Sequence, residues 1–303
     1  MDGSRSTNVS EAPLVSIVVA CYNHGDFIEE SLRSVFAQDY PNIELIVVND
    51  GSTDRSLEVI ERLRSEHHFT LINQSNQGVT RAVSAGLEVA RGEFFLTFDS
   101  DDIMLPSRIS IQVGHLLKHP ELGGCGANFQ FIDAQGAPMK GAPNKPAARY
   151  RFKDFFENDD IWLGGPTAVF RREAVLKAGG YDINNRIQDH HLELRITHAG
   201  YPLDIIEDMV TLYRQHGRNQ SHNYKGNYPW LLMGLDCYRD HPGYMRGKRS
   251  LINNTLRSAV KYDREFARQL FSELPWYRWN GKTIKRYRHF LFKYRPGKEL
   301  VKA

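Results

Sequence analysis

Residues 90–106 read ARGEFFLTFDSDDIMLP, and this stretch decides the fold. The apolar run Phe94–Phe98 has the length and composition of a buried strand in a parallel sheet. Three carboxylates follow where that strand ends, at Asp99, Asp101 and Asp102. Carboxylates this close repel one another unless a cation or water screens them, and Mg²⁺ and Mn²⁺ bridge such groups to substrate phosphates. The stretch therefore predicts a divalent-cation site, although an acidic turn before the helix that follows Pro106 is an alternative interpretation.

Upstream of this stretch, short apolar runs alternate with helical patterns. Further strands are predicted at residues 15–20, 43–48 and 69–73, and helices around residues 28–36, 57–63, 79–90 and 109–117. Such alternation is typical of an α/β domain with a mostly parallel sheet, in which ligands bind beyond the carboxyl ends of the strands. We therefore expect the chemistry in four loops, Tyr22–Asp26, Asn49–Asp54, Asn73–Gly78 and Asp99–Asp102.

Two of these loops carry groups that suit a nucleotide. Asp50 can accept a hydrogen bond from a nucleobase N–H, and the ring of Tyr22 can stack on a base. Each group also has an ordinary interpretation, since Ser52 or Thr53 could cap a helix and Tyr22 could simply pack. The chain contains no G-x-G-x-x-G after the first strand and no Walker A sequence, which disfavours dinucleotide oxidoreductases and P-loop enzymes.

The composition is that of a globular protein from a reducing compartment. The chain has 303 residues, 41% of them hydrophobic, which is enough for one large domain with an appendage or for two domains. Three cysteines, Cys21, Cys125 and Cys237, are too few and too far apart for a disulfide framework or a cysteine zinc site. No apolar run reaches about 18 residues, and residues 1–12 are polar. We expect a loose N-terminal tail at 1–12, no membrane-spanning helix and a cytoplasmic location.

Three segments together resemble a known family. Residues 13–54 (PLVSIVVACYNHGDFIEESLRSVFAQDYPNIELIVVNDGSTD), Asn76-Gln77-Gly78 and residues 90–106 are similar to family 2 glycosyltransferases, and the resemblance extends from residue 13 to about 221. It implies an α/β GT-A fold, with a mostly parallel central sheet flanked by helices. The nucleotide-sugar half would be 13–105, the acceptor half 106–221, and residues 222–303 would form a helical, basic C-terminal region.

The resemblance also implies a reaction. Members of this family are inverting enzymes, usually metal-dependent, that use nucleoside-diphosphate sugars. We expect a UDP- or dTDP-linked donor and a glycan or lipid-linked acceptor in the synthesis of surface polysaccharide or lipopolysaccharide. Two alternatives are a non-catalytic nucleotide-sugar or glycan-binding protein of the same fold and, less favoured, a sugar nucleotidyltransferase. The nucleotidyltransferase lacks support because no glycine-rich, arginine-containing loop follows the first strand.

Carried over residue by residue, the resemblance assigns roles. Asp189 would be the catalytic base, in a segment where Gln188 replaces the usual glutamate; its alternative role is to cap a helix. Asp101 would bind Mn²⁺ or Mg²⁺, with His216 of the Tyr213–His216 element as a second ligand. Nucleotide contacts are expected from Ala20, Tyr22, Asn23, Asp50, Gly78, Asp99 and Ser100. Diphosphate or acceptor contacts are expected from Arg81, Asp102, Trp162, Gly165, Arg214 and Arg218.

The C-terminal segment 276–303 has a composition of its own. It holds nine Lys and Arg residues against the single acid Glu299, whereas the rest of the chain carries a net charge of 30 − 35 = −5. Aromatic residues interleave with these bases, as they do in segments that lie on an anionic membrane surface. The alternatives are that the aromatics pack back onto the catalytic domain or, with less support, that the segment binds nucleic acid, since no nucleic-acid module accompanies the charge. We expect a peripheral location on the inner face of the cell membrane and no nucleic-acid partner.

Overall fold

The computed structural model describes residues 12–158, 160–217, 219 and 223–292. Within this part of the chain, one nine-stranded sheet runs through the N-terminal two thirds, in the order β3-β2-β1-β4-β8-β6-β9-β5, with β7 paired to β9. Its first four strands are parallel and confirm the four strands predicted from sequence. They are β1 (Val15–Cys21), β2 (Ile43–Asp50), β3 (Thr70–Gln74) and β4 (Phe94–Asp99).

Helices cover both faces of the parallel part of the sheet, which explains why the central strands β1 and β4 are largely apolar. Ile17 and Val19 of β1 lie in one buried cluster with the apolar faces of α1, α2 and α4, whereas Val18 points to the other side, toward α3. A strand buried on both faces reads as a continuous apolar run instead of an alternating one. The helices are α1 (Ile28–Phe36), α2 (Ser56–Glu66), α3 (Val79–Val89) and α4 (Arg108–Lys118).

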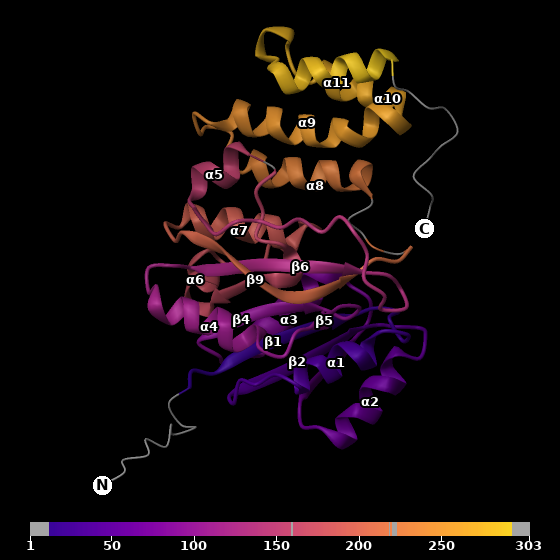
Figure 1. Ribbon diagram of the computed structural model, residues 1–303, viewed down its shortest axis with the longest axis vertical. Helices are drawn as coiled ribbons and strands as arrows, with labels where there is room; N and C mark the ends of the chain where they lie inside the picture. The colour runs from indigo at the N-terminus through magenta and orange to yellow at the C-terminus, as the bar shows by residue number, and fades with distance from the viewer. Residues whose placement is uncertain (1–11, 159, 218, 220–222, 293–303) are drawn as a thin grey trace.

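The second part of the sheet is mixed. β8 runs antiparallel to its two neighbours, β4 and β6. On its other side, β6 pairs with β9 and runs parallel to it. The two-stranded unit of β6 and β9 spans the molecule above the parallel strands (Figure 1). These strands are β5 (Ile103–Met104), β6 (Gly124–Ile132), β7 (Ala148–Tyr150), β8 (Val169–Arg171) and β9 (Leu203–Arg214).

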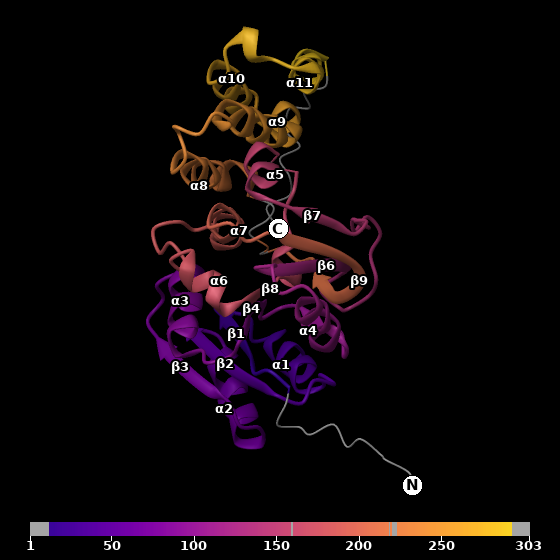
Figure 2. The ribbon, with the colours of Figure 1, turned by 90° about the vertical axis from the view of Figure 1, so that its left-hand side faces the viewer.

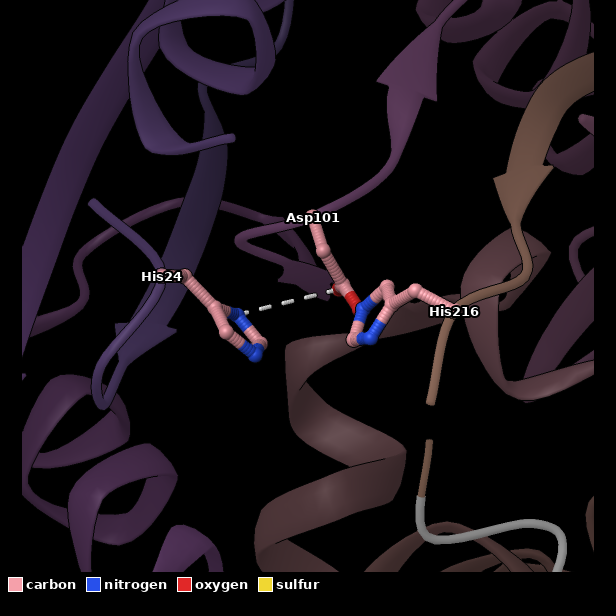
Figure 3. A group of neighbouring side chains, drawn as sticks. All are labelled: His24, Asp101 and His216. Carbon is pink, nitrogen blue, oxygen red and sulfur yellow. Dashed lines mark hydrogen bonds and ion pairs between the residues drawn. The ribbon is translucent and has the colours of Figure 1, made fainter. Parts of the chain in front are cut away.

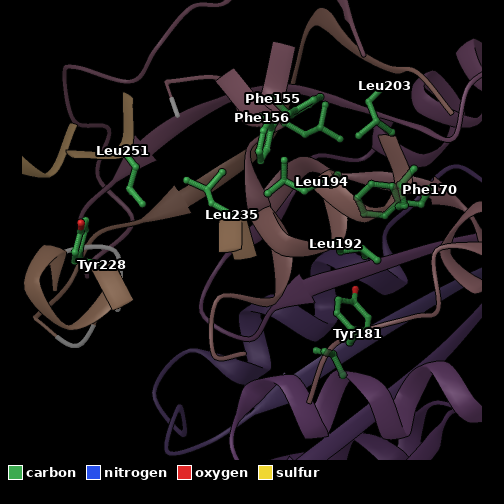
Figure 4. Close-up of a cluster of buried hydrophobic side chains, with 14 of the residues drawn as sticks. Phe155, Phe156, Phe170, Tyr181, Leu192, Leu194, Leu203, Tyr228, Leu235 and Leu251 are labelled. Atoms are coloured by element: carbon green, nitrogen blue, oxygen red, sulfur yellow. The ribbon is translucent and has the colours of Figure 1, made fainter. Parts of the chain in front are cut away.

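The remaining helices form layers that extend from the sheet to one end of the molecule (Figures 1 and 2). One hydrophobic cluster runs through these layers without a break, from Leu192 and Leu194 through Phe156 to Leu235 and Leu251 (Figure 4). The C-terminal helices therefore share a core with the domain below them. They are α5 (Phe152–Glu157), α6 (Arg172–Lys177), α7 (Gln188–His198), α8 (Tyr224–Asp236), α9 (Tyr244–Tyr262), α10 (Arg264–Ser272) and α11 (Gly281–Phe292). Among the described residues, no helix combines the length and apolarity that crossing a membrane requires.

Candidate active site

The loops that follow β1 and β2 are tied together by hydrogen bonds. The backbone N–H of Asn23 donates to Ser52 Oγ at 3.1 Å, and the N–H of Thr53 donates to Asn23 Oδ1 at 2.8 Å. The N–H of His24 donates to Ser56 Oγ at 3.0 Å. Ser52 and Thr53 therefore join two loops at the carboxyl edge of the sheet. The alternative interpretation, that one of them caps α2, is wrong, because that helix begins only at Ser56.

Asp50 organises the neighbouring loop. It is buried at the end of β2 and accepts hydrogen bonds from the backbone N–H groups of Gln77 and Gly78, at 2.9 and 2.8 Å, and from Gln74 Nε2 at 2.7 Å. Gly51 has φ +70°, and a Cβ there would lie 2.5 Å from the backbone nitrogen of Asn76, so only glycine fits this turn. The carboxylate is thus held rigidly, and its Oδ2 accepts one bond where Oδ1 accepts two.

The acidic turn after β4 concentrates negative charge. Ser100, Asp101 and Asp102 are buried, while part of the Asp99 side chain reaches solvent. Desolvation by the surrounding protein, together with repulsion from the charges of Asp101 and Asp189, raises the pKa of Asp99 to about 7. Burial and repulsion from Asp101 and Asp99 raise the pKa of Asp102 well above its ordinary value, and Asp102 Oδ2 has no hydrogen-bond partner among the described residues. Such a cluster favours a bound cation.

Two histidines from distant segments, His24 and His216, converge on Asp101 of this turn (Figure 3). His216 Nε2 lies 2.8 Å from Asp101 Oδ2, and His24 Nδ1 lies 4.0 Å from Asp101 Oδ1. One nitrogen of each histidine and one oxygen of Asp101 lie within 4.8 Å of one another. The ring of Phe27 stacks on that of His216, with 4.9 Å between the ring centroids. Two imidazoles and a carboxylate are a suitable donor set for a divalent transition metal, so the residues fit the expected metal. His24 is a candidate ligand that no local sequence pattern indicated.

Arg214 holds the acidic turn through hydrogen bonds to Asp101 and Asp102. Its backbone N–H donates to Asp102 Oδ1 at 2.8 Å, and its Nε donates to the carbonyl of Asp101 at 2.8 Å. Its Nη1 donates to the carbonyls of Asp133 and Ala134, and its Nη2 pairs with Glu30. Every guanidinium nitrogen is thus engaged in a side chain that is only 2% exposed. The expected diphosphate or acceptor contact for Arg214 is therefore corrected: it positions the turn that carries Asp101.

A second buried arginine links the acidic turn to the segment around Gly165. Arg108 donates from Nη1 to the carbonyl of Pro166 at 2.7 Å and to Thr211 Oγ1 at 3.1 Å. Burial lowers its pKa to about 10, which leaves it cationic at neutral pH, and its charge partly offsets those of Asp99 and Asp102. Sequence alone gave no signal for this residue, since a basic residue at the start of an amphipathic helix ordinarily faces solvent.

Asp189 lies at the start of α7 and faces the same edge. Its Oδ1 accepts the N–H of His190 at 2.8 Å, and its charge raises the pKa values of both Asp99 and Glu193. A Cβ built on Gly165 would lie 2.6 Å from Asp189 Oδ2, so the carboxylate rests directly over this glycine. The fold therefore brings Asp189, Gly165 and the acidic turn together, as the sequence predicted for one site.

Replacing Gly165 by alanine should lower kcat with little effect on stability. The new methyl group would displace the Asp189 carboxylate, and a displacement of about 1 Å can reduce a rate about 10²-fold. Steady-state kinetics would show the loss in kcat, with the thermal midpoint nearly unchanged because a side-chain end can move. Gly114→Ala is the matched control: it lies inside α4 with no atom within 4 Å of the new Cβ, so activity should persist. Equal losses in the two variants would contradict the role of Gly165.

Glu193, one turn after Asp189 on α7, holds the loop before Gly165. Its Oε1 accepts the N–H of Leu163 at 3.2 Å, and its Oε2 has no partner among the described residues. Burial and the neighbouring Asp189 raise the pKa of Glu193 well above its ordinary value. Trp162 lies on the same loop, and Lys145, from the segment between β6 and β7, places its Nζ 4.4 Å from the ring centroid of Trp162 and donates to the Trp162 carbonyl. Trp162 is half-buried, with Lys145 against its ring.

Glu193→Gln should become more stable relative to the wild type as pH rises. The unfolded glutamate releases its proton near pH 4.5, whereas burial raises the pKa of the folded glutamate well above that value, so rising pH favours unfolding of the wild type above pH 4.5. Each pKa unit of difference is worth about 1.4 kcal/mol at neutral pH. Thermal midpoints measured from pH 4.5 to 7 should show a widening gap between variant and wild type. Glu88→Gln, at an exposed position, is the control. If the difference in thermal midpoint between Glu193→Gln and wild type changed with pH no more than that of the control, the expectation would be refuted.

The other predicted residues are distributed as follows. Tyr22 is 45% exposed at the open side of the β1 loop, and Ala20 is partly buried near the end of that strand. Arg81 is exposed on the first turn of α3. Arg218 lies outside the described residues. His24, Arg108, Lys145 and Glu193 were not expected, because their roles depend on contacts between segments far apart in sequence.

Comparisons with known proteins agree with this geometry. Residues 16–179 match the family described as glycosyl transferase family 2. The amylovoran biosynthesis glycosyltransferase AmsE of Erwinia amylovora is 26% identical over 257 residues, which cover 80% of this chain and 93% of that protein. An uncharacterized glycosyltransferase of Haemophilus influenzae is 32% identical over 152 residues, 50% of this chain and 45% of that protein. The chain thus spans about half the length of the two Haemophilus influenzae relatives it matches.

Solved structures share the fold. TarS 1–349 of S. aureus, in complex with UDP-GlcNAc, superposes with a TM-score of 0.60 at 15% identity, over 91% of this chain and 89% of that chain. The mannosyltransferase PcManGT of Pyrobaculum calidifontis, in complex with GDP-Man and Mn²⁺, gives a TM-score of 0.58 at 19% identity, over 93% and 86%. At these identities the likeness concerns the fold, and the expected GT-A fold is confirmed.

Proposed function

The chain belongs to glycosyl transferase family 2 and is a glycosyltransferase, and from this premise we propose that it transfers a sugar from a nucleoside-diphosphate donor, with inversion, to a glycan or lipid-linked acceptor. The observation that carries the proposal is the convergence of His24, Asp101 and His216 with Asp189 at one edge of the sheet. The likeness to AmsE supports a role in surface polysaccharide or lipopolysaccharide synthesis.

The donor nucleotide is assigned to the loops after β1, β2 and β4. Tyr22 presents an exposed ring beside the rigid turn at Asn23, and Asp50 offers an oxygen with spare hydrogen-bond capacity. Uracil, thymine and guanine all carry a ring N–H from which such an oxygen can accept a hydrogen bond, and among them we propose a UDP- or dTDP-sugar as the donor. Asp99 and Ser100 would contact the ribose side of the donor.

A divalent cation would be held by Asp101, His216 and His24. Imidazole ligands favour Mn²⁺ over Mg²⁺, because Mg²⁺ prefers oxygen ligands. When bound, the cation would neutralise charge on the diphosphate as it leaves. Arg214 holds the backbone of Asp101, and Phe27 fixes the plane of the His216 ring, so this chain provides a preformed set of ligands.

Asp189 would deprotonate the acceptor hydroxyl. Inversion requires the acceptor oxygen to attack the anomeric carbon from the face opposite the leaving group, while a base on that side takes its proton. Asp189 lies on a helix across from the acidic turn, with Gly165 leaving its Oδ2 uncovered by a side chain. Trp162 and Gly165 would shape the adjoining acceptor pocket, and Asp102 and Arg81 remain candidate contacts to the diphosphate or the acceptor.

Thermal unfolding with UDP, dTDP, GDP, ADP or CMP, each with and without Mn²⁺, tests the donor site. A ligand at about 100 times its Kd adds about 2.7 kcal/mol of stability, which moves the midpoint by several degrees. A metal-dependent shift with one nucleotide would support the proposal and name the base. Transfer should then release the nucleoside diphosphate, and release of pyrophosphate would instead indicate a nucleotidyltransferase. No shift with any nucleotide would count heavily against the donor site.

A further inference from the structure

The segment from Trp276 to Phe292 exposes an unusual number of large apolar side chains. Of the thirteen large hydrophobic residues that are exposed among the described residues, six come from this short segment. They are Trp276 (80% exposed), Tyr277 (67%), Ile284 (53%), Tyr287 (38%), Leu291 (47%) and Phe292 (82%). Single exposed apolar residues are normal on a protein surface, but a concentrated group indicates an interaction site.

The structure divides the aromatic residues of this segment into two sets. Trp279, Tyr287 and Phe290 pack against Phe271 of α10, with ring centroids 5.5, 5.3 and 5.6 Å from it. Trp279 Nε1 also donates to the carbonyl of Leu274 at 2.9 Å. These contacts fix α11 on the helices below it. Trp276, Tyr277 and Phe292 are left pointing to solvent, so packing onto the domain accounts for only part of the aromatic content.

The exposed aliphatic residues lie on one face of α11. Ile284 and Leu291 are seven residues apart, two turns of helix, and therefore share a face. Thr283 and Phe290 have the same spacing and mark the buried face. The helix is thus anchored on one face and presents a second apolar face with no covering element among the described residues.

Positive charge surrounds these apolar residues. Residues 276–292 contain five basic residues and no acidic one: Arg278, Lys282, Lys285, Arg286 and Arg288. Lys282 pairs with Asp160 at 3.1 Å, whereas Lys285 and Arg288 form no ion pair within the described part of the chain. The whole segment lies at the end of the molecule opposite the parallel strands (Figures 1 and 2).

We propose that this tip, comprising the loop at Trp276–Arg278 and the outward face of α11, docks the protein on an anionic phospholipid bilayer. Apolar side chains on a basic amphipathic helix enter the boundary between headgroups and acyl chains, and Trp and Tyr favour that boundary. Unpaired Lys and Arg residues are attracted to the negative surface of such a membrane. An anionic bilayer is the partner that matches both the positive charge and the exposed apolar side chains of this tip. Docking does not require the proposed transferase activity.

Vesicle co-sedimentation of the full chain tests the proposal. Binding is expected to vesicles that contain phosphatidylglycerol and not to pure phosphatidylcholine, with release at about 1 M salt, where the screening length is about 3 Å. The double variant Trp276→Ser, Phe292→Ser should bind about tenfold more weakly or worse, because it loses two of the most exposed anchors. Lys285→Ser with Arg288→Ser should also weaken binding and reduce its salt dependence.

The control is Leu117→Ser, which removes an exposed aliphatic residue of α4 (51% exposed) and should leave vesicle binding unchanged. All variants change exposed side chains, and unchanged nucleotide-induced thermal shifts would show that the fold and donor site persist. Failure of wild-type binding to anionic vesicles, or undiminished binding of the aromatic double variant, would overturn the proposal. If the protein self-associated without vesicles and the double variant abolished this, the tip would be an interface between copies of the chain. Binding to an oligonucleotide in preference to vesicles would also overturn the proposal.

Discussion

Asp101→Asn is expected to lower kcat/KM about 10³-fold, which corresponds to about 4 kcal/mol of transition-state stabilisation. Asp101 is the only carboxylate in the group that His24 and His216 approach, and asparagine removes its charge while keeping an acceptor oxygen for His216. The backbone of the turn is held by Arg214 through main-chain and side-chain contacts, so the variant should fold. Removing one of several crowded carboxylates should leave its thermal midpoint equal to or above that of the wild type.

Mn²⁺ binding gives a readout separate from catalysis. Electron paramagnetic resonance titration of Asp101→Asn should show loss of the bound Mn²⁺ seen with wild type. The control Asp26→Asn removes an exposed carboxylate that pairs with Arg55 outside the ligand group, and it should keep both binding and transfer. Normal Mn²⁺ affinity in Asp101→Asn would show that the cation lies elsewhere, whatever happened to activity.

His24→Ala extends the same experiment to the residue that only the structure identified. If His24 is a ligand, Mn²⁺ affinity should fall about tenfold or more, a loss of the size seen when groups around a metal are removed. Loss of its hydrogen bond to Ser100 Oγ, at 2.7 Å, is local. His119→Ala, on a partly buried histidine that follows the last residue of α4, is the control. Unchanged affinity in His24→Ala would leave Asp101 and His216 as the protein ligands.

The parallel strands were predictable because burial on both faces leaves a strong local signal. Val15–Cys21 and Phe94–Asp99 are largely apolar, and polar residues follow at their carboxyl ends, where sheet geometry places a ligand. The short strands β5, β7 and β8 have only two or three residues, too few for any periodicity to appear. Their positions depend on pairing with β4, β6 and β9.

The site residues divide along the same line. Asp99–Asp102 and Asp189 could be predicted because carboxylates at strand and helix ends form recognisable local patterns. His24 and Arg108 could not, because each acts on residues more than fifty positions away, such as Asp101 and Pro166. Arg214 shows the opposite error: its Tyr-Arg-x-His context suggested a ligand contact, but its burial beneath the acidic turn gives it a positioning role.

Asp189→Asn is expected to reduce kcat about 10³- to 10⁴-fold, near the upper end of what general-base catalysis contributes. Asparagine cannot take the acceptor proton, yet it keeps the oxygen that accepts the N–H of His190, so α7 should begin as before. Donor binding should persist, because Asp189 lies across the site from the loops assigned to the nucleotide. The loss should therefore appear in kcat, with an unchanged nucleotide-induced thermal shift.

Glu193→Gln tests whether the loss of rate in Asp189→Asn is specific to Asp189 or follows from changing any carboxyl group on α7. Glu193 lies one turn further along α7, and burial, together with the charge of Asp189, raises the pKa of its carboxyl well above the ordinary value, which favours the neutral form that glutamine resembles in charge and shape. Its transfer rate should stay within a few-fold of wild type while that of Asp189→Asn collapses. If both variants lose activity alike, the acidic segment of α7 acts by holding the Leu163–Gly165 loop, and the base must be sought elsewhere. If neither loses activity, Asp189 serves only to begin the helix, the alternative that its position always allowed.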